Sequence, residues 1–441
     1  MYGHNSLHPA NPSTIVHFNA QLSPLFDFPK RSIMSTRLPN SSGRLNTMDE
    51  QTPRTTQGVP QDTQNTEPEA SDTQDTQDTQ VTLETTSQGD DEFVQLPMVV
   101  AVDLGGTQIR TAVLRGSKLL SRIGLLTGEN PSPDRIMPRL FQAVRQAVEK
   151  AHVPMSDIKG IGIGAPGPLD NRTGTVFSPP NLPGWDNVPV RDLFNKEFHV
   201  PIYVENDANA AALGEYMFGA GRGSRDMVYL TISTGIGGGV ITDGKIIEGV
   251  SGTAAELGHM TVDWHGERCN CGNIGCLERI ASGTNIARRA NEAIAVGRGN
   301  DLLAFALEHQ RPQETQEEPM EVTAAETQGK PHTPFYVNSR TVAQAAEAGI
   351  PVAQEIILRA AEAIGVGLVN IIHIFNPEMI ILGGGVTQMG PLLLDPVMTV
   401  VQERAMKVPR KACRIMLAQL GQDVGLVGAG ALMYYYGEQE K

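Results

Sequence analysis

Three of the four cysteines in this 441-residue sequence lie within the short segment CNCGNIGC, residues 269–276. Three thiolates with one imidazole form a donor set that suits a tetrahedral zinc ion and leaves no position open for water. A disulfide is less favourable, because four cysteines in a chain of this length do not form a disulfide framework and C-x-C spacing strains the bond. His265 competes for the fourth position. The candidate zinc ligands are His259, Cys269, Cys271 and Cys276.

A carboxylate follows an apolar strand pattern in the segment VENDANAAALGE, residues 204–215. Asp207 stands where this segment turns from strand to helix, so it is a candidate N-cap residue. The same position suits a general base that takes a proton from a hydroxyl group attacking a phosphate. Both roles can hold at once. Asn206 has a donor and an acceptor and is a candidate binder of that hydroxyl.

Three glycine-rich turns follow predicted strands, at 103–107 (DLGGT), 233–239 (STGIGGG) and 382–385 (LGGG). Main-chain N–H groups of such turns can approach a phosphate closely and form a concave anion site. Thr107 and Thr234 add hydroxyl donors. A carboxylate at the strand end, Asp103, suits a hydrated Mg²⁺ ion. The three turns together favour nucleotide binding.

Two further glycine patterns are false matches. GIGAPG at 162–167 fits the dinucleotide-binding pattern, but Pro166 and Pro168 prevent the helix that must begin there. GVITDGKI at 239–246 fits the P-loop spacing, but Ile246 replaces the hydroxyl residue that would hold Mg²⁺.

A repeated pattern of elements must position these residues. Apolar runs predict buried strands at 98–104 and 227–233, and each is followed by a glycine turn, a second strand, a tight turn and a third strand. Helical spacing of apolar residues predicts helices over 134–151 and 352–375. The recurrence indicates duplication of one α/β unit with a ligand between the halves.

The predicted domains follow from this repetition and from composition. The tail, residues 1–95, has 13 acids against 5 bases and a near-repeat SDTQDTQDTQ, so we expect it to be disordered. The first α/β domain is expected at 96–205, joined by a C-terminal helix at about 425–441. A larger α/β domain is expected at 206–424, with the zinc loop at 259–278 and a polar insertion at 309–332.

Bulk composition excludes several classes of protein. The sequence has no strong basic bias, which argues against a nucleic-acid binder, and no run of 18 apolar residues, which argues against a membrane span. The N-terminus lacks the pattern of a secretory signal. We therefore expect a cytoplasmic protein, with Cys413 as an ordinary core residue.

The segment ISTGIGGGVITDGKIIEGVSGTAAELGH, residues 232–259, resembles the signature of the ROK family of sugar kinases and sugar-responsive repressors. CNCGNIGCLE is similar to the zinc motif of ROK glucokinases, and DLGGT and ENDANAAALGE match the family's phosphate and catalytic motifs. The resemblance spans residues 97–441 apart from the insertion. It implies two related α/β domains of the actin/hexokinase-like (ribonuclease H-like) fold, with sugar and ATP in the cleft between them.

Residue roles are also implied by the resemblance. Asp207 matches the catalytic base. Positions that bind sugar hydroxyls match Gly167, Asn206, Glu256, His259 and Glu278. The phosphates would be surrounded by Asp103, Gly105, Gly106, Thr107, Thr234 and Gly235, and the adenine would lie near Gly384 and Gly385. One departure is Gln108, which stands where many relatives carry Lys.

The resulting expectation is an ATP- and Mg²⁺-dependent hexose kinase with structural Zn²⁺, acting on the sugar 6-hydroxyl, with glucose as first substrate. N-acetylglucosamine, N-acetylmannosamine, mannose or fructose are alternatives in the same class, and polyphosphate is an alternative donor. A ROK-type regulator or non-catalytic sugar sensor is the alternative from a different class, although the acidic tail predicts no DNA-reading helix. The resemblance further implies a homodimer or homotetramer.

Overall fold

A computed structural model of the chain describes residues 95–439, except 129–130, 180 and 310–336. The predicted tail 1–95 and the predicted insertion 309–332 therefore lie almost entirely outside the described residues. All described residues belong to one compact unit, Asp75–Lys441. The boundary predicted near residue 205 stays a prediction.

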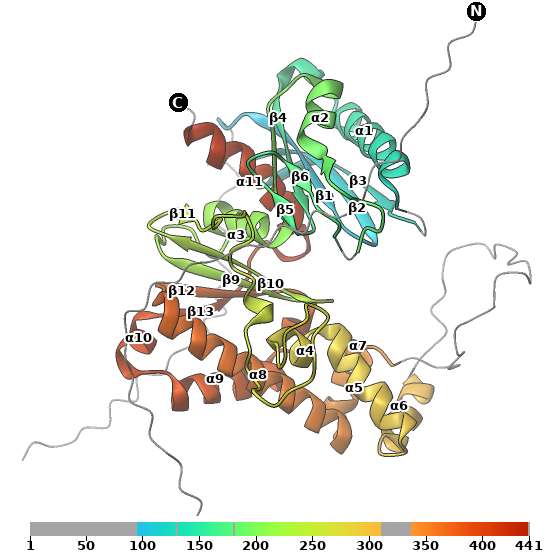
Figure 1. Cartoon of the computed structure of the whole chain (residues 1–441), viewed down its shortest axis with the longest axis vertical. Helices are drawn as coiled ribbons and strands as arrows, with labels where there is room; N and C mark the ends of the chain where they lie inside the picture. The colour runs from blue at the N-terminus through green and yellow to red at the C-terminus, as the bar shows by residue number, and fades with distance from the viewer. Residues whose placement is uncertain (1–94, 129–130, 180, 310–336, 440–441) are drawn as a thin grey trace, which may run out of the picture. The chain divides into compact units, whose positions relative to one another are not determined.

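Two five-stranded sheets with the same topology form the framework (Figure 1). The first has the order β3-β2-β1-β4-β8 and the second the order β11-β10-β9-β12-β13. In each, the first three strands in sequence pair antiparallel and the last two add in parallel. The first sheet contains β1 (Met98–Leu104), β2 (Gln108–Arg115), β3 (Lys118–Leu126), β4 (Ile158–Ala165) and β8 (Ile202–Asn206). The second contains β9 (Met227–Ile232), β10 (Ile236–Thr242), β11 (Lys245–Ile246), β12 (Met379–Gly383) and β13 (Arg414–Leu417). The repeated topology agrees with the duplication inferred from the sequence.

The segment between β4 and β8 departs from expectation. Residues 165–189 read as an irregular Pro/Gly loop, yet they contain a small antiparallel sheet. Its strands are β5 (Leu169–Asp170), β6 (Thr175–Val176) and β7 (Val188–Pro189). Strands of two residues are too short to show an alternating apolar pattern, which explains why the sequence did not reveal them.

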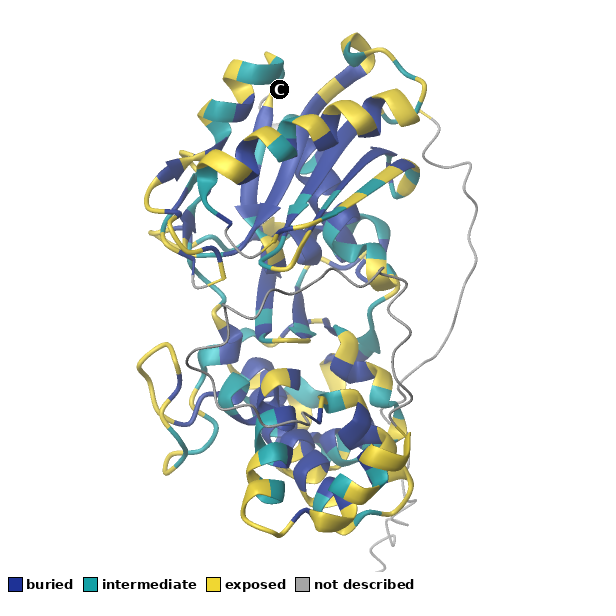
Figure 2. Ribbon diagram, turned by 90° about the vertical axis from the view of Figure 1, so that its right-hand side faces the viewer, coloured by how far each residue is buried: buried dark blue, intermediate teal, exposed yellow. Residues whose placement is uncertain are grey.

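Helices cover both faces of both sheets. Their bounds are α1 (Pro133–Lys150), α2 (Val190–Phe198), α3 (Asp207–Phe218), α4 (Leu277–Ala281), α5 (Gly283–Ala295), α6 (Asn300–His309), α7 (Ser339–Glu347), α8 (Pro351–Phe375), α9 (Pro391–Arg404), α10 (Lys407–Ala412) and α11 (Val424–Gln439). Short 3₁₀ turns add η1 (Met155–Asp157), η2 (Leu257–His259), η3 (Gly385–Met389) and η4 (Gly421–Asp423). Helices α1 and α2 pack on the first sheet, and the helices from α4 to α9 share a core with the second. Figure 2 shows the buried sheet interiors and the buried centre of this helical layer.

Strand β9 shows why its sequence is apolar almost throughout. Val228, Leu230 and Ile232 face the core shared with α8. Met227 and Tyr229 face the opposite side, where α3 and α11 pack. A strand buried on both faces needs apolar residues at nearly every position.

The C-terminal helix α11 packs closely on α3 and on β1 and β4 of the first sheet. Small residues permit this approach, because a Cβ atom at Gly214 would lie 2.9 Å from the Cα atom of Gly428. A Cβ atom at Gly162 would collide with the carbonyl oxygen of Ala429. The Gly/Ala-rich composition of α11 therefore sets how closely the two helices and the first sheet approach.

Helix α8 is long and apolar enough to cross a membrane by length and composition alone. However, 67% of its most apolar 18-residue window is buried inside the protein. Ile364, Leu368 and Ile372, for example, belong to the helical core. These contacts are those of a central core helix.

Candidate active site and metal site

Asp207 is the first residue of α3, directly after β8. The N-cap is Asn206, whose Oδ1 accepts hydrogen bonds from the N–H groups of Ala208 (2.9 Å) and Asn209 (3.3 Å). The interpretation of Asp207 as the N-cap is therefore wrong by one residue. The carboxylate of Asp207 accepts from the Ala208 N–H through Oδ1 at 2.8 Å.

The surroundings of Asp207 raise its pKa to about 6, from an ordinary value of 3.8. Burial by the surrounding protein is the largest cause, followed by the negative charge of Asp103, with Glu256 adding to it. The side chain of Asp207 is nevertheless exposed to solvent in this structure, and contact with water moderates the effect of burial on its pKa. A carboxylate with this pKa is ionised at neutral pH and is a stronger base than an ordinary aspartate.

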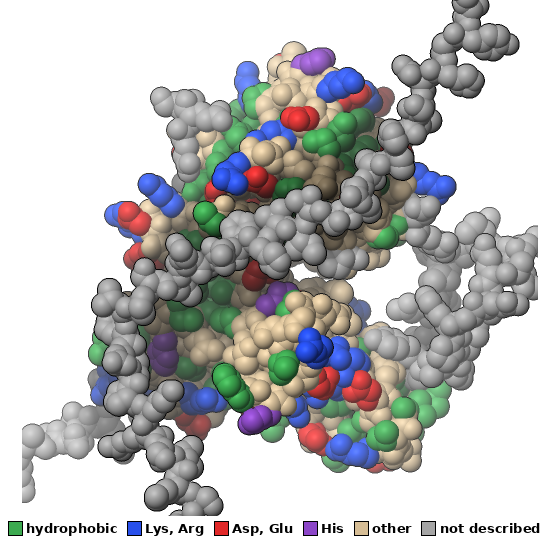
Figure 3. All heavy atoms as spheres, viewed as in Figure 1, with side chains coloured by type: hydrophobic (Ala, Val, Ile, Leu, Met, Phe, Trp, Pro, Cys, Tyr) green, Lys and Arg blue, Asp and Glu red, His purple; other side chains and the backbone are tan. Residues whose placement is uncertain are grey.

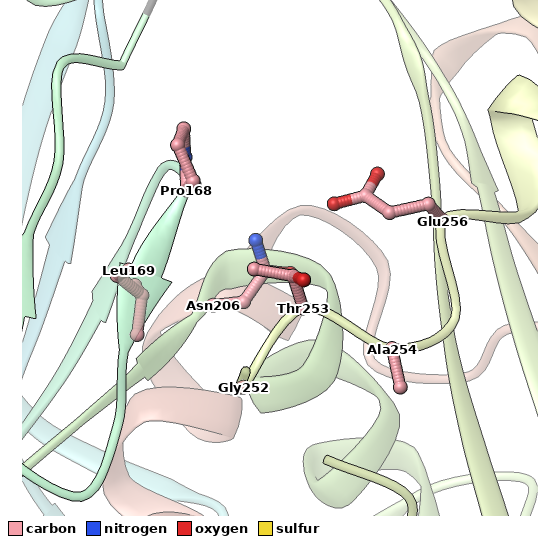
Figure 4. Close-up of a pocket in the computed structure, with 8 residues that line it drawn as sticks. Pro168, Leu169, Asn206, Gly252, Thr253, Ala254 and Glu256 are labelled. Carbon is pink, nitrogen blue, oxygen red and sulfur yellow. The ribbon is translucent and has the colours of Figure 1, made fainter. Parts of the chain in front are cut away.

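A small pocket adjoins Asp207. Its volume is about 10 Å³, close to that of one water site. The lining residues are Gly167, Pro168, Leu169, Asn206, Gly252, Thr253, Ala254 and Glu256. In Figure 4 the amide nitrogen of Asn206 and the carboxylate of Glu256 point into the same space, which Pro168 borders. The pocket therefore offers a hydrogen-bond donor and a carboxylate next to the candidate base.

Of the predicted sugar-site residues, Gly167, Asn206 and Glu256 line this pocket, whereas Asp207, His259 and Glu278 do not. A Cβ atom at Gly167 would lie 3.2 Å from Nδ2 of Asn206, so the Gly167 turn adjoins the capping residue. Burial raises the pKa of Glu256, while His259 lowers it and Glu278 raises it. These influences indicate that the three side chains are electrostatic neighbours.

The β1–β2 turn carries the predicted phosphate residues. Gly105 N–H donates to the Gln108 carbonyl oxygen at 2.9 Å, and the hydroxyl of Thr127 donates to the Gly105 carbonyl oxygen at 2.7 Å. Thr107 and Gln108 are exposed at this turn. A Cβ atom at Gly106 would lie 2.7 Å from the Cβ of Asn181, so only glycine allows this approach.

Asp103 has a partner that the sequence did not suggest. Its Oδ2 accepts from Nε of Arg110 at 2.8 Å, and a second guanidinium nitrogen contacts the same oxygen. The remaining terminal nitrogen of Arg110 donates to the carbonyl oxygen of Gln422 at 2.7 Å. One carboxylate oxygen of Asp103 is thus held by Arg110. This still fits Mg²⁺, which binds few protein carboxylates and keeps several waters.

The β9–β10 turn is held from the side of α4. Oε2 of Glu278 accepts from the Ile236 N–H at 2.9 Å, and a Cβ atom at Gly235 would lie 2.6 Å from the same oxygen. The carbonyl oxygen of Ser233 accepts from the Gly283 N–H at 2.7 Å. Glu278, predicted as a sugar binder, therefore also supports the predicted phosphate turn.

A larger cavity of about 490 Å³ opens beside this turn. It is lined by Ser233, Thr234, Gly283, Thr284, Ala287, Asn338, Ser339, Arg340, Ala343, Gln344, Glu347, Gly385, Val386, Gln388 and Met389. Of the predicted nucleotide residues, Thr234 and Gly385 belong to this lining. Gly384 adjoins it in sequence and has a φ of 89°, and a Cβ atom there would collide with the Ile232 carbonyl oxygen. Its role is to make the turn after β12.

Sequence reasoning missed the part of this cavity that α7 supplies. Asn338 caps α7 by accepting from the Thr341 N–H at 2.9 Å, and Ser339, Arg340 and Gln344 follow on the helix. The only signal was the helix-start pattern Asn-Ser-Arg-Thr. It lies next to the polar insertion, and no spacing rule connects it to the glycine turns.

The four predicted metal ligands form one cluster. Their donor atoms all lie within 4.8 Å of one another. The Sγ atoms of Cys271 and Cys276 are 3.6 Å apart, and Sγ of Cys269 is 3.8 Å from Nδ1 of His259. Tetrahedral zinc with ~2.3 Å bonds to sulfur places two sulfurs ~3.8 Å apart, so the donor set fits zinc. His265, the competing ligand, is outside this cluster, and all four cysteines are free, with Cys413 buried.

The metal cluster lies in the chain between Glu256 and Glu278. Residues 260–262 pair with residues 275–277: the Val262 N–H donates to Gly275 O at 2.8 Å and the Leu277 N–H to Met260 O at 3.0 Å. His259 ends η2, and Cys276 occupies the N-cap position of α4. A metal bound here would hold together the two segments that carry the pocket carboxylates.

Comparison with known proteins agrees with this arrangement. The family model described as "ROK family" matches residues 99–435. A glucokinase of Halalkalibacterium halodurans is 33% identical over 336 residues, which is 76% of this chain and 94% of the relative. A xylose repressor of Caldicellulosiruptor bescii is 32% identical over 300 residues, or 68% of each chain. The crystal structure of a ROK family glucokinase from Streptomyces griseus, in complex with glucose and AMPPNP, has 33% identity and a TM-score of 0.61, covering 76% of this chain and 98% of that one.

The chain has the fold of the actin-like sugar kinases, and it belongs to the ROK family. The resemblance inferred from DLGGT, ENDANAAALGE and the cysteine segment is thus confirmed. Relatives of similar identity include kinases and a repressor. Sequence identity alone therefore does not assign an activity, and the activity must be argued from the residues of the site.

Proposed function

We propose that the protein transfers the γ-phosphoryl group of ATP to the 6-hydroxyl of a hexose, with glucose as its substrate. The observation that carries this proposal is Asp207. It stands at the start of α3 with a pKa of about 6, next to a pocket formed by Asn206 and Glu256. Similarity to glucokinases over 94% of a relative's length supports the same activity.

In the proposed reaction, Asp207 takes the proton of the attacking sugar hydroxyl as the oxygen bonds to phosphorus. The amide nitrogen of Asn206 donates to a sugar oxygen, while its Oδ1 stays engaged as the helix cap. Glu256 accepts from a second sugar hydroxyl. The pocket of about 10 Å³ is too small for a sugar, so binding requires the loop 247–256 and the Gly167 turn to separate and then close.

The glycine turns would bind the phosphates of ATP through main-chain N–H groups, and the 490 Å³ cavity would take the nucleoside. Asp103 would hold a hydrated Mg²⁺ ion, which supplies charge neutralisation at the phosphates. Arg110, already bound to Asp103, adds a fixed positive charge beside this turn. That charge matters because Gln108 replaces the lysine of many relatives.

His259, Cys269, Cys271 and Cys276 would bind a structural zinc ion. The ion would hold the segment of Glu256 against the segment of Glu278, and so organise sugar recognition without contacting phosphate. One ring nitrogen of His259, Nδ1, faces the cysteines. The other would face a sugar hydroxyl.

A regulatory function is the second candidate, because a xylose repressor is 32% identical to the chain. The chain covers 68% of that repressor, and the acidic tail predicts no DNA-reading helix. Side chains of both charge signs are interspersed on the face in Figure 3. We propose a cytoplasmic kinase that binds small molecules and forms a homodimer or homotetramer, rather than a nucleic-acid-binding or membrane protein.

The proposal is tested by measuring ADP release by the full chain with Mg-ATP, using glucose, mannose, fructose, N-acetylglucosamine and N-acetylmannosamine. Turnover on glucose well above the others, lost in Asp207→Asn, would support the glucokinase. Preference for an acetylated sugar would keep the mechanism and change the substrate. Sugar binding without turnover on any sugar would favour a sensor instead.

A further inference from the structure

A second carboxyl group, Glu205, lies two residues before the candidate base and is fully buried. Four polar groups surround its carboxyl group. Oε1 accepts from the Asn206 N–H (2.9 Å) and from Nδ2 of Asn209 (3.1 Å). Oε2 accepts from Nδ2 of Asn171 at 2.9 Å and lies 3.0 Å from the hydroxyl of Tyr436. Glu205 thus contacts β8, α3, α11 and the segment after β5.

The Tyr436 hydroxyl has a second carboxyl neighbour. It lies 2.8 Å from Oε1 of Glu248, in the loop after β11. Three oxygens, from Glu205, Tyr436 and Glu248, therefore form two contacts of hydrogen-bond length. A phenol supplies one proton, and each O–H···O bond needs one. The chain of contacts requires a second proton, carried by one of the two carboxyl groups.

Glu205 is the better site for this proton. Every partner that the described structure gives its carboxyl group is uncharged, and burial raises its pKa. Glu248 is only partly buried, and the positively charged Arg172 lies within electrostatic range of it. As a neutral acid, Glu205 donates from Oε2 to Tyr436, which donates to Glu248. The contacts to Asn171, Asn206 and Asn209 are kept, and no net charge is buried.

We propose that Glu205 is a proton-carrying positioning residue, which through Tyr436 ties the strand–helix junction that bears Asp207 to the loop 247–256. Its role toward catalysis rests on the proposed kinase function. The protonation of Glu205 and its contact with Tyr436 do not depend on that function.

The tie reaches both sides of the small pocket. On one side, Glu205 fixes the N–H of Asn206 and the side chain of Asn209, and so the first turn of α3. On the other side, the carbonyl oxygen of Glu248 accepts from the Ala254 N–H at 3.0 Å, within the pocket-lining segment. The last turns of α11 therefore link the first turn of α3, which carries the base, to the loop 247–256.

A neutral Glu205 also places no buried negative charge two residues from Asp207. The titratable groups around Glu205 are Asp207 from its own segment, Tyr436 from α11 and Glu248 from the loop after β11. Arg172 lies beyond Glu248, and Arg191 contacts the carbonyl oxygen of Asn171.

The test compares three variants and a matched control. In Tyr436→Phe both hydroxyl contacts are lost with little change in volume, and kcat/KM for the sugar should fall about tenfold, mainly through KM. Glu205→Ala should lose at least as much. Glu205→Gln should recover to within about threefold, because its amide nitrogen can donate to Tyr436 in place of the acid and the Asn171 amide can turn so that its unpartnered Oδ1 accepts from the same nitrogen. The control is Tyr435→Phe, on the same helix, which loses only a bond from the Ile246 N–H.

Two results would overturn the proposal by kinetics. Tyr436→Phe could behave like Tyr435→Phe, or Glu205→Gln could be as impaired as Glu205→Ala, which would mean that an ionised carboxylate is required. The pH profile of Glu205→Gln should keep the acid limb of the wild-type enzyme.

An infrared difference spectrum between wild type and Glu205→Gln at neutral pH tests the proton without any turnover. The carbonyl stretch of a protonated carboxyl group should be present in the wild type and lost in the variant; its absence would refute the proposal. If the carbonyl stretch is present and no sugar is phosphorylated, the protonated contact between Glu205 and Tyr436 is supported and the proposed kinase function is wrong.

Discussion

The raised pKa of Asp207 predicts where activity is lost in acid. A general base must be ionised, and a pKa of about 6 leaves about a tenth of the molecules active one pH unit below it. The value of kcat/KM for the sugar reports the free enzyme, whose site the structure describes. It should be level above pH ~7, halved near pH ~6 and fall about tenfold per unit below. An aspartate with the ordinary pKa of 3.8 would keep full activity at pH ~5.

The assay is the initial rate of ADP release at low sugar and saturating Mg-ATP, with enzyme stability checked at each pH. The same pH profile measured for Asp103→Asn provides a second test. It removes a negative charge that raises the pKa of Asp207 and leaves Arg110 unpaired, so the acid limb should move to lower pH even though the rate falls. An acid limb near pH ~4, or one that does not move in Asp103→Asn, would refute the reasoning.

Protonation of Asp207 should change the stability of the fold in the opposite sense to its effect on activity. The folded-state pKa of Asp207 lies above its unfolded value of 3.8, so its protonation stabilises the fold below that pH. This contribution is lost as the pH rises through about 6. At pH ~7 the neutral variant Asp207→Asn should therefore melt at the same temperature as wild type or higher, while losing activity. A clear decrease in its melting temperature would contradict the electrostatic account.

Three further predictions concern other positions. Cys271→Ser should lose zinc, measured by elemental analysis, and weaken calorimetric sugar affinity; intact affinity in the zinc-free variant would show that the metal does not organise the site. Ala255 has a φ of 64°, so Ala255→Gly should relieve strain and raise the unfolding free energy by about 0.5–1 kcal/mol in urea titrations. Buried Glu215 accepts from the N–H groups of Ala220, Gln419 and Leu420, so Glu215→Gln should lower that free energy by about 1–3 kcal/mol. Unchanged urea midpoints would contradict these two expectations.

Much of the fold could be predicted because its elements are long and regular. The strands at 98–104 and 227–233 and the helix at 352–375 agree with β1, β9 and α8 to within a residue or two. Strand β13 was not predicted, since its four residues alternate weakly between exposed and buried positions. The small sheet within 165–189 was not predicted either, because its strands of two residues are too short to show an alternating pattern.

The site residues could be predicted where residues that act together lie close in the sequence. They could not be predicted where they meet only through contacts between distant segments. The cysteine cluster could be predicted because its ligands lie in one loop. The cap was misplaced because Asn206 and Asp207 both suit that position, and only backbone geometry separates them. The pairing of Asp103 with Arg110 and the contact between Tyr436 and Glu205 join residues whose spacing in the sequence carries no signal.

The central claim is that Asp207 removes the proton of a sugar hydroxyl bound beside Asn206 and Glu256. The most direct measurement is the single-turnover rate of phosphoryl transfer from ATP to glucose in wild type and Asp207→Asn, together with calorimetric glucose affinity. The account predicts a rate lower by about 10²–10⁴-fold with affinity changed only a few-fold. A variant that still transfers phosphate at the wild-type rate would contradict it.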